Sequence, residues 1–278
     1  MKGKFIVIEG VDGAGKETQS KIIKNILNVV CDKQVHLLSF PNHLDQSSYL
    51  VKQYLEGKFP KSENLDTLSY YKQISSFYTM DRVYTIFKDD GDISYFKKLK
   101  DGDNIICDRY TTSNIIHMAA NLDMNNMGID IFSYVDWIQY MEYNIFKLPK
   151  PDLVIFLDVS ISQAIKNLEN RSNTNIDNIN DIHEKKHHQY SVNRIKDTII
   201  NLCGWETVNC MSKENTHEML SKEEISKRII HVINKKFNID LIKRFSDEEC
   251  FSNMLQSTIV SDVIINKGQS YIKQKGVY

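Results

Sequence analysis

The chain has 278 residues, 41% hydrophobic and 26% charged, a balance typical of globular proteins and not of disordered ones. A formal net charge of −1 provides no overall basic field for nucleic acid or membrane surfaces, and no apolar run approaches the about 18 residues of a membrane span. The five cysteines form no C-x-x-C pair, so we expect a cytoplasmic protein without a disulfide framework or zinc site.

Five short apolar runs predict buried strands. Four are nearly continuous, as strands covered on both faces are, and the fifth is weaker. The runs are residues 4–9, 35–40, 104–108, 152–159 and 205–210. Apolar residues recurring every three to four positions predict helices over 17–30, 128–147 and about 222–236. This alternation implies an α/β fold, with about five parallel strands and helices on both faces of the sheet.

Two segments do not fit this pattern. Residues 172–182 are polar and rich in asparagine, which predicts a mobile loop. The segment after the last predicted helix looks partly helical, with a terminal strand or a loose tail. We therefore expect one domain over residues 1–236 and a C-terminal extension over 237–278.

The stretch GVDGAGKET predicts a phosphate-binding loop. Gly10, Gly15 and Lys16 match G-x-x-x-x-G-K between a predicted strand and a predicted helix. The glycines allow backbone N–H groups to approach phosphate oxygens, the helix N-terminus favours the anion, and the lysine adds a positive charge. The pattern indicates an ATP site in a three-layer sandwich of the P-loop NTPase type. The site would comprise Gly10, Val11, Asp12, Gly13, Ala14, Gly15, Lys16, Glu17 and Thr18.

Glu17 departs from this pattern, because a hydroxyl that contacts Mg²⁺ normally follows the lysine. Its carboxylate either binds Mg²⁺ directly or only favours the helix N-terminus as an anionic residue. The hydroxyl of Thr18 points about 100° away around the helix. We expect an altered metal shell that includes Glu17.

Two further stretches suggest an acceptor site. Asp108 ends a predicted strand and would hold Mg²⁺ through water, and Arg109 offers a planar guanidinium suited to a monophosphate; the alternative is a surface ion pair. Tyr78 and Arg82 are four residues apart and share a helix face, where they would stack on a base and donate to it. Alternatively, Tyr78 belongs to an apolar stripe that includes Ile74 and is core.

Together these segments resemble thymidylate kinases of the nucleoside-monophosphate kinase group. The resemblance covers about residues 3 to 233 in the order of that family, and it is closest to a subgroup with DIHE (181–184) and GW (204–205). The matching pieces are KFIVIEGVDGAGKETQ, SFPN, YLEGKF, FYTMDR, IICDRYTTSN, LPKPDLVIFLDV and ENRS.

The resemblance implies a role for each matching residue. Asp12 would contact the deoxyribose 3′ hydroxyl or the acceptor phosphate, and Arg109 would clamp that phosphate. Tyr78 would stack on the base and Arg82 would donate to a thymine carbonyl. Gly13 stands where some members carry a catalytic arginine, so Arg171 in a lid of about residues 171–186 would supply it. Asn114 and His117, on one helix face, would line the acceptor pocket.

The expected reaction is transfer of phosphate from ATP with Mg²⁺ to a deoxynucleoside monophosphate, dTMP in the first place, giving dTDP. Met118 stands where a glutamine commonly helps to read the base, which leaves open dUMP, a modified pyrimidine monophosphate or a nucleoside as acceptor. Glu17 and the extension leave open a weakly active, nucleotide-dependent interaction protein. Family analogy suggests a homodimer, without nucleic acid or membrane as partner.

Overall fold

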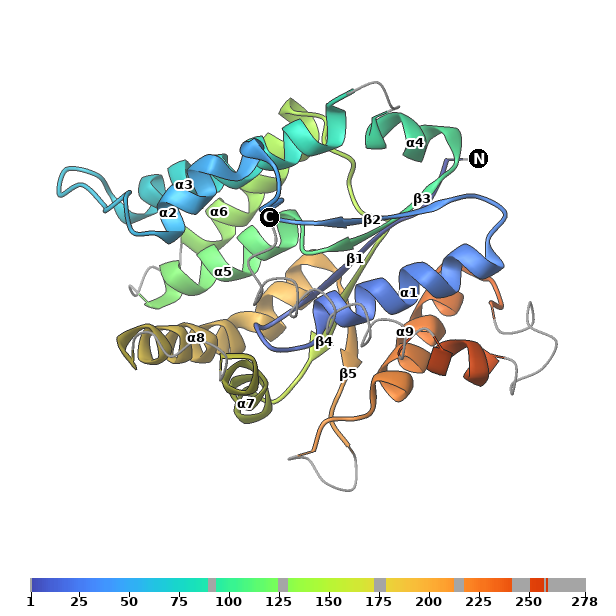
Figure 1. The fold of residues 1–278 in the computed structure, drawn as a ribbon. Helices are drawn as coiled ribbons and strands as arrows, with labels where there is room; N and C mark the ends of the chain where they lie inside the picture. The colour runs from blue at the N-terminus through green and yellow to red at the C-terminus, as the bar shows by residue number, and fades with distance from the viewer. Residues whose placement is uncertain are drawn as a thin grey trace, which may run out of the picture.

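The fold contains one five-stranded parallel sheet in the order β2-β3-β1-β4-β5 (Figure 1). The computed structural model describes residues 2–89, 94–124, 130–172, 179–212, 218–241, 251–257 and 259. The strands are β1 (Phe5–Gly10), β2 (Val35–Ser39), β3 (Asn104–Asp108), β4 (Leu153–Asp158) and β5 (Glu206–Asn209). The sheet predicted from the apolar runs is confirmed, with strand ends that differ by at most a residue or two.

Helices cover both faces of this sheet, which explains why β1, β3 and β4 are largely apolar and buried. On one face, α1 (Lys16–Val30) packs beside α9 (Lys222–Phe237). On the other, α5 (Thr111–Met124) contacts α3 (Thr67–Phe87), α6 (Asp130–Gln139) and α8 (Ile179–Cys203). Three further α-helices are α2 (Tyr49–Leu55), α4 (Tyr95–Asp101) and α7 (Ile161–Ser172).

Alternate residues of β1 contribute to different layers of the core. Ile6 and Ile8 belong to the same buried cluster as Ile22 and Ile26 of α1. Phe5 and Val7 join a second cluster with Ile86 of α3 and Leu99 of α4. A strand whose successive side chains point to opposite faces must be apolar at every position when both faces are covered.

Two predicted helices are confirmed almost to the residue. The pattern over 17–30 is α1, and the pattern over 222–236 is α9. A capping box begins α9, because the Ser221 hydroxyl accepts from the Glu224 amide while the Glu224 carboxylate accepts from the Ser221 amide.

The helix predicted over 128–147 is not one regular α-helix. After α6 the chain forms a π-helical segment, Tyr140–Ile145, in which hydrogen bonds span five residues, as from the Phe146 amide to the Met141 carbonyl (2.9 Å). The helical structure ends at Ile145, and residues 125–129 lie outside the described part. The wider turn changes which side chains face the interior, and it places Glu142 there.

The loop predicted over 172–182 is wrong at both ends. Ser172 is the last residue of α7, and α8 already begins at Ile179; residues 173–178 lie outside the described part. Farther along, α8 buries Val192, Ile195 and Ile199. A polar composition does not prevent its first turns from being helical, because an amphipathic helix anchored farther along can extend into solvent.

The extension packs against the domain where it is described. Residues 251–257 are helical, in line with the partly helical expectation, and Phe251 and Leu255 are buried members of the main core cluster. Ser252 donates to Glu223 on α9 (3.3 Å). The predicted terminal strand or tail falls on residues 260–278, outside the described part. Across the described residues, no helix is long and apolar enough to span a membrane.

Candidate active site

The carboxyl ends of neighbouring strands bring the two predicted halves of the site together. In the sheet register Asp108 of β3 pairs with Ile8 of β1 on one side and with Ser39 of β2 on the other. The Arg109 amide donates to the Ile8 carbonyl (3.2 Å). The loop after β1 and the turn after β3 are therefore adjacent, as expected for a ligand site of a parallel sheet.

The phosphate loop has a backbone that needs glycine. Gly13 has φ +86°, and a Cβ there would lie 2.3 Å from the Ala164 carbonyl oxygen of α7. Gly15 has φ +89° and is the N-cap of α1. Asn167 of α7 donates to the Gly13 carbonyl (2.9 Å). The loop is thus fixed between two helices, with the N-terminus of α1 available to an anion.

Lys16 is folded back onto its own loop. Its Nζ donates to the carbonyls of Gly10 (2.8 Å) and Val11 (2.9 Å), and the side chain is 5% exposed. Burial, followed by repulsion from Arg109, lowers the pKa of Lys16 to about 8, against the opposing effect of Asp12. A phosphate group in the loop would offer this ammonium stronger acceptors than the two neutral carbonyls.

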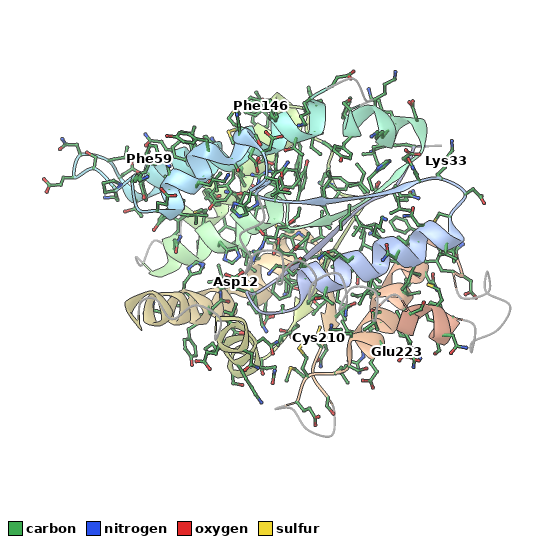
Figure 2. All side chains as sticks on the ribbon, viewed as in Figure 1. Asp12, Lys33, Phe59, Phe146, Cys210 and Glu223 are labelled. Carbon is green, nitrogen blue, oxygen red and sulfur yellow. The ribbon has the colours of Figure 1, made fainter. Side chains whose placement is uncertain are left out.

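Asp12 links the loop to the acceptor side and to α8. Its Oδ1 contacts Nη2 of Arg109, whose backbone has the left-handed φ of 65°, and its Oδ2 accepts from Nε2 of Gln189 (3.1 Å). Burial alone would raise the pKa of Asp12, but the charges of Arg109 and Lys16 outweigh it and hold the pKa well below its usual range. Asp12 lies near the centre of the molecule, beside α8 (Figure 2).

One histidine lies beside Arg109, and a second histidine stacks on the first. His117 Nε2 lies 3.3 Å from Arg109 Nη1, and His117 Nδ1 lies 3.0 Å from Nε2 of His188 on α8. Their rings are stacked, with 5.2 Å between centroids. Burial, with repulsion from Arg109 and His188, lowers the pKa of His117 to about 3. His117 therefore stands beside the acceptor clamp as a neutral ring.

The two predicted metal ligands differ in their surroundings. Oδ1 of Asp108 is buried and has no hydrogen-bond partner among the described residues, and burial raises the pKa of this carboxyl despite Lys16 and Arg109 nearby. The Glu17 side chain is 59% exposed and pairs with Lys21 (2.8 Å). Thr18 is half-buried in the first turn of α1. A buried carboxylate oxygen without a partner suits a hydrated cation.

Arg82 lies inside the protein, 1% exposed, where a carboxylate missed by sequence reasoning binds it. Its Nε donates to Glu142 Oε2 (3.0 Å), and its Nη2 donates to Glu142 Oε1 (2.5 Å) and to Asn114 Oδ1 (2.9 Å). The other end of that amide, Nδ2 of Asn114, is buried without a partner among the described residues. The predicted pair of Arg82 and Asn114 is therefore in direct contact, with one donor left over.

Tyr78 lies against the core, and its stacking on a base stays a prediction. The ring is half-buried, packs against the main core and meets Tyr54 edge-on, with 6.4 Å between centroids. Burial raises the pKa of Tyr78 to about 12, and the charges of Arg82, Arg109 and Asp12 also act on its hydroxyl. The residue is thus a core neighbour at the edge of the acceptor site.

The remaining predicted residues are Arg171 and Met118. Arg171 lies in α7, four residues after Asn167 and so on the same face of that helix, but its side chain is outside the described part. Met118 is a buried core residue of α5, whose sulfur lies 3.9 Å from Nδ2 of Asn121.

Comparison with known proteins identifies one family. A family model described as thymidylate kinase matches residues 8–225. The thymidylate kinase of Dictyostelium discoideum is 31% identical over 165 residues, 59% of this chain and 62% of that protein. A probable thymidylate kinase of Methanococcus aeolicus is 30% identical over 231 residues, 82% of this chain and 98% of that protein.

The fold also matches a solved structure. The thymidylate kinase of Candida albicans aligns with a TM-score of 0.58 and 20% identity, over 85% of this chain and 93% of that one. At that identity the likeness concerns the fold alone.

Proposed function

The chain belongs to the thymidylate kinase family, and we propose that it phosphorylates dTMP to dTDP with ATP at the site around Asp12. The observation that carries this proposal is the meeting of two cations at one carboxylate. Lys16, from the phosphate loop, lies 3.8 Å from Asp12 Oδ1, and Arg109, from the acceptor side, contacts the same oxygen. A triphosphate bound at Lys16 and a monophosphate bound at Arg109 would therefore lie side by side.

The charges support distinct roles for Arg109 and Asp12. The guanidinium of Arg109 can bind two oxygens of the acceptor phosphate at once. Asp12 stays ionised at neutral pH, since its pKa is held low, and like charges repel. It therefore suits a sugar hydroxyl, which donates a hydrogen bond, better than a phosphate. Gln189 orients this carboxylate through Oδ2.

The chemical step needs positioning more than acid–base chemistry. An oxygen of the acceptor phosphate is already anionic and attacks the γ-phosphorus in line, so no general base is required. Lys16 and the amides of the phosphate loop stabilise charge on the transferring group. Arg171 of the lid would add a further positive charge, and a closed lid would exclude water and so limit ATP hydrolysis.

Mg²⁺ is the metal that this reaction implies, and the donor set fits it. Oδ1 of Asp108 offers a buried oxygen without a partner among the described residues, next to the loop that would hold the phosphates. Glu17, one residue after Lys16, would join from the exposed side after leaving Lys21. When bound, the ion neutralises and orients the phosphate oxygens of ATP.

The polar groups at the base end favour a pyrimidine with carbonyl groups. Asn114 Nδ2 and the guanidinium of Arg82 are donors, which match the carbonyl oxygens of thymine, and Tyr78 supplies a ring face nearby. The apolar Met118 has no fixed polar preference and suits the thymine methyl.

A coupled ADP-release assay over a panel of acceptors tests the proposal. The panel comprises dTMP, dUMP, dCMP, dAMP, dGMP and free thymidine, and we expect dTMP to give the highest kcat/KM. A preference for another nucleotide or for thymidine would overturn the acceptor, and ATP binding without turnover on any of them would indicate a nucleotide-dependent interaction protein. The homodimer and the cytoplasmic location remain predictions, which sedimentation and microscopy of a tagged protein address.

A further inference from the structure

Glu142 is a buried carboxylate whose two oxygens are both occupied. The side chain is 0% exposed and belongs to the π-helical segment after α6. Oε1 accepts from Thr79 (2.8 Å) and from Arg82 Nη2 (2.5 Å). Oε2 accepts from Arg82 Nε (3.0 Å) and from the hydroxyl of Thr111. The carboxylate therefore joins α3, which carries Thr79 and Arg82, to α5, which carries Thr111.

This arrangement fixes the orientation of Arg82 and, through it, of Asn114. Two bonds to one carboxylate hold the planar guanidinium in a single position. Because Arg82 Nη2 donates to Asn114 Oδ1, the amide of Asn114 must present Nδ2, its donor end, on the other side. None of these bonds uses Nη1 of Arg82. The network therefore offers the base N–H donors.

We propose that Glu142 is a positioning residue that makes the acceptor site select a 4-oxo pyrimidine over a 4-amino pyrimidine. The proposal rests on the proposed function, since it assumes that Arg82 and Asn114 meet the base. Thymine and uracil carry a carbonyl oxygen at C4, which accepts from a guanidinium or an amide N–H. Cytosine carries an amino group there, whose hydrogens would face donors and leave buried groups unpaired.

The contribution of Glu142 to the stability of the fold does not by itself account for its burial. A buried ion pair contributes little net stability, because the cost of desolvating both charges offsets their attraction. The π-helical turn that directs Glu142 inward is a rare conformation that is found often at functional sites. Because net stability does not account for this ion pair, the role that remains for Glu142 is to orient Arg82 at the acceptor end of the site.

Glu142→Gln tests the proposal. One end of the amide becomes an N–H donor. Because each oxygen of Glu142 accepts from Arg82, this donor opposes an N–H of Arg82 in either orientation of the amide, and the guanidinium loses part of its support. We expect kcat/KM for dTMP to fall about tenfold, the value of one lost hydrogen bond of ~1.4 kcal/mol. The Ki of dCMP as a competitor of dTMP should change by a smaller factor. The preference for dTMP over dCMP should therefore shrink, while KM for ATP stays the same.

Asp81→Asn is the matched control. Asp81 is, like Glu142, a buried carboxylate, and it lies on α3. It accepts from the Asn42 amide (2.8 Å) and from the Ser47 hydroxyl, and not from Arg82. Its loss should lower the melting temperature without changing the preference for dTMP over dCMP. An equal loss of preference in both variants would reduce Glu142 to a general packing role and overturn the proposal.

A second variant covers the case in which Glu142→Gln does not fold. Thr79→Val combined with Thr111→Val removes one hydrogen bond from each carboxylate oxygen and keeps the ion pair. We expect a smaller loss of preference in the same direction, and an unchanged preference would contradict the proposal. If the wild-type enzyme does not phosphorylate dTMP at all, the proposed function fails; if it does and the variants keep its selectivity, only the role of Glu142 fails.

Discussion

The ammonium of Lys16 lies 3.8 Å from the carboxylate of Asp12 while it donates to two carbonyls of its own loop. The lysine is thus held within its own loop and does not reach into solvent. ATP must replace these neutral acceptors with phosphate oxygens, which bind an ammonium more strongly. This relationship makes Lys16 the residue at which the loop and its ligand can be tested most directly.

Lys16→Ala should reduce kcat by at least about 10²-fold, the usual effect of removing a group that stabilises charge in the transition state. The fold should remain, because the loop conformation depends on its glycine backbone. Gly13→Ala is the contrasting variant: its Cβ would meet the Ala164 carbonyl at 2.3 Å, so we expect a lower melting temperature as well as lost activity. Steady-state kinetics and thermal unfolding of both variants provide the measurement, and a Lys16→Ala enzyme with most of its activity would contradict the phosphate-loop assignment.

ATP affinity should weaken in mildly alkaline solution. Because the pKa of Lys16 is lowered to about 8, the free enzyme loses this charge above that pH, well before an ordinary lysine at about 10.4 does. The Kd of ATP should then rise about tenfold per pH unit. Between the two pKa values the unfolded chain holds the extra proton, so this group's contribution to stability increases with pH there. Calorimetric titration at several pH values measures the effect. Lys16→Arg, which keeps its charge, should show a flat profile.

Arg171→Ala should lower kcat about 10³-fold while the Kd of ATP changes little. An arginine that closes over the phosphates acts chiefly on charge in the transition state. Single-turnover kinetics and nucleotide titration separate the two quantities. An effect confined to KM would mean that Arg171 only binds nucleotide, and Lys185 or Lys186 of the lid would then be the residues to replace next.

Replacing either of the two acidic residues near the phosphate loop should raise the Mg²⁺ concentration that the enzyme needs. Asp108→Asn should raise the Mg²⁺ concentration for half-maximal rate severalfold. The substitution removes the negative charge from a side chain whose buried Oδ1 has no hydrogen-bond partner among the described residues. Glu17→Ala should raise it too, and Glu17→Thr should keep activity. Lys21→Ala, which removes the ion pair with Glu17 at 2.8 Å, is the control and should leave the Mg²⁺ requirement the same or lower, because Glu17 no longer has to leave that pair to reach the metal. If Glu17→Ala and the wild type give the same Mg²⁺ titration curve, Glu17 acts only as a charged residue at the N-terminus of α1.

Met118→Gln should sharpen the acceptor preference. The thioether is buried in α5 and offers no strong hydrogen bond, so in the proposed base site it would leave one polar group of the base unpaired, at a cost of ~1–3 kcal/mol. For the wild type we expect dUMP to be used less well than dTMP and the purine monophosphates not at all. The ratio of kcat/KM for dTMP and dCMP in both proteins decides the matter, because thymine and cytosine differ in the hydrogen-bonding groups that a glutamine can read, and identical ratios would remove Met118 from the base site.

Local sequence patterns were enough to predict most of the fold. The continuous apolar runs located the strands because both faces of the sheet are covered, and the spacing of Gly10, Gly15 and Lys16 located the loop. Arg109 lies next to the phosphate loop because it follows a strand whose carboxyl end lies beside β1, and its role as the phosphate clamp stays a prediction. Each of these inferences uses residues that are near one another in the chain.

Contacts between distant segments could not be predicted in the same way. Glu142 is 60 residues from Arg82, and Gln189 is 177 residues from Asp12. Neither stands in a motif, and the π-helical turn that directs Glu142 inward has no sequence signature of its own. The ends of the loop predicted over 172–182 were wrong because the polar residues from 179 onward do not reveal that they begin a helix whose later turns are buried.

The burial of Phe251 and Leu255 has a consequence for how this chain can evolve. Apolar surface is worth ~25 cal/mol per Å² when it is kept from water, so a lineage that lost the extension would expose the side of the core that these two side chains cover. It would survive only if polar substitutions appeared there at the same time. Substitutions in α9 near Glu223 are likewise constrained, because Ser252 of the extension donates a hydrogen bond to Glu223. The two segments are therefore expected to change together or not at all.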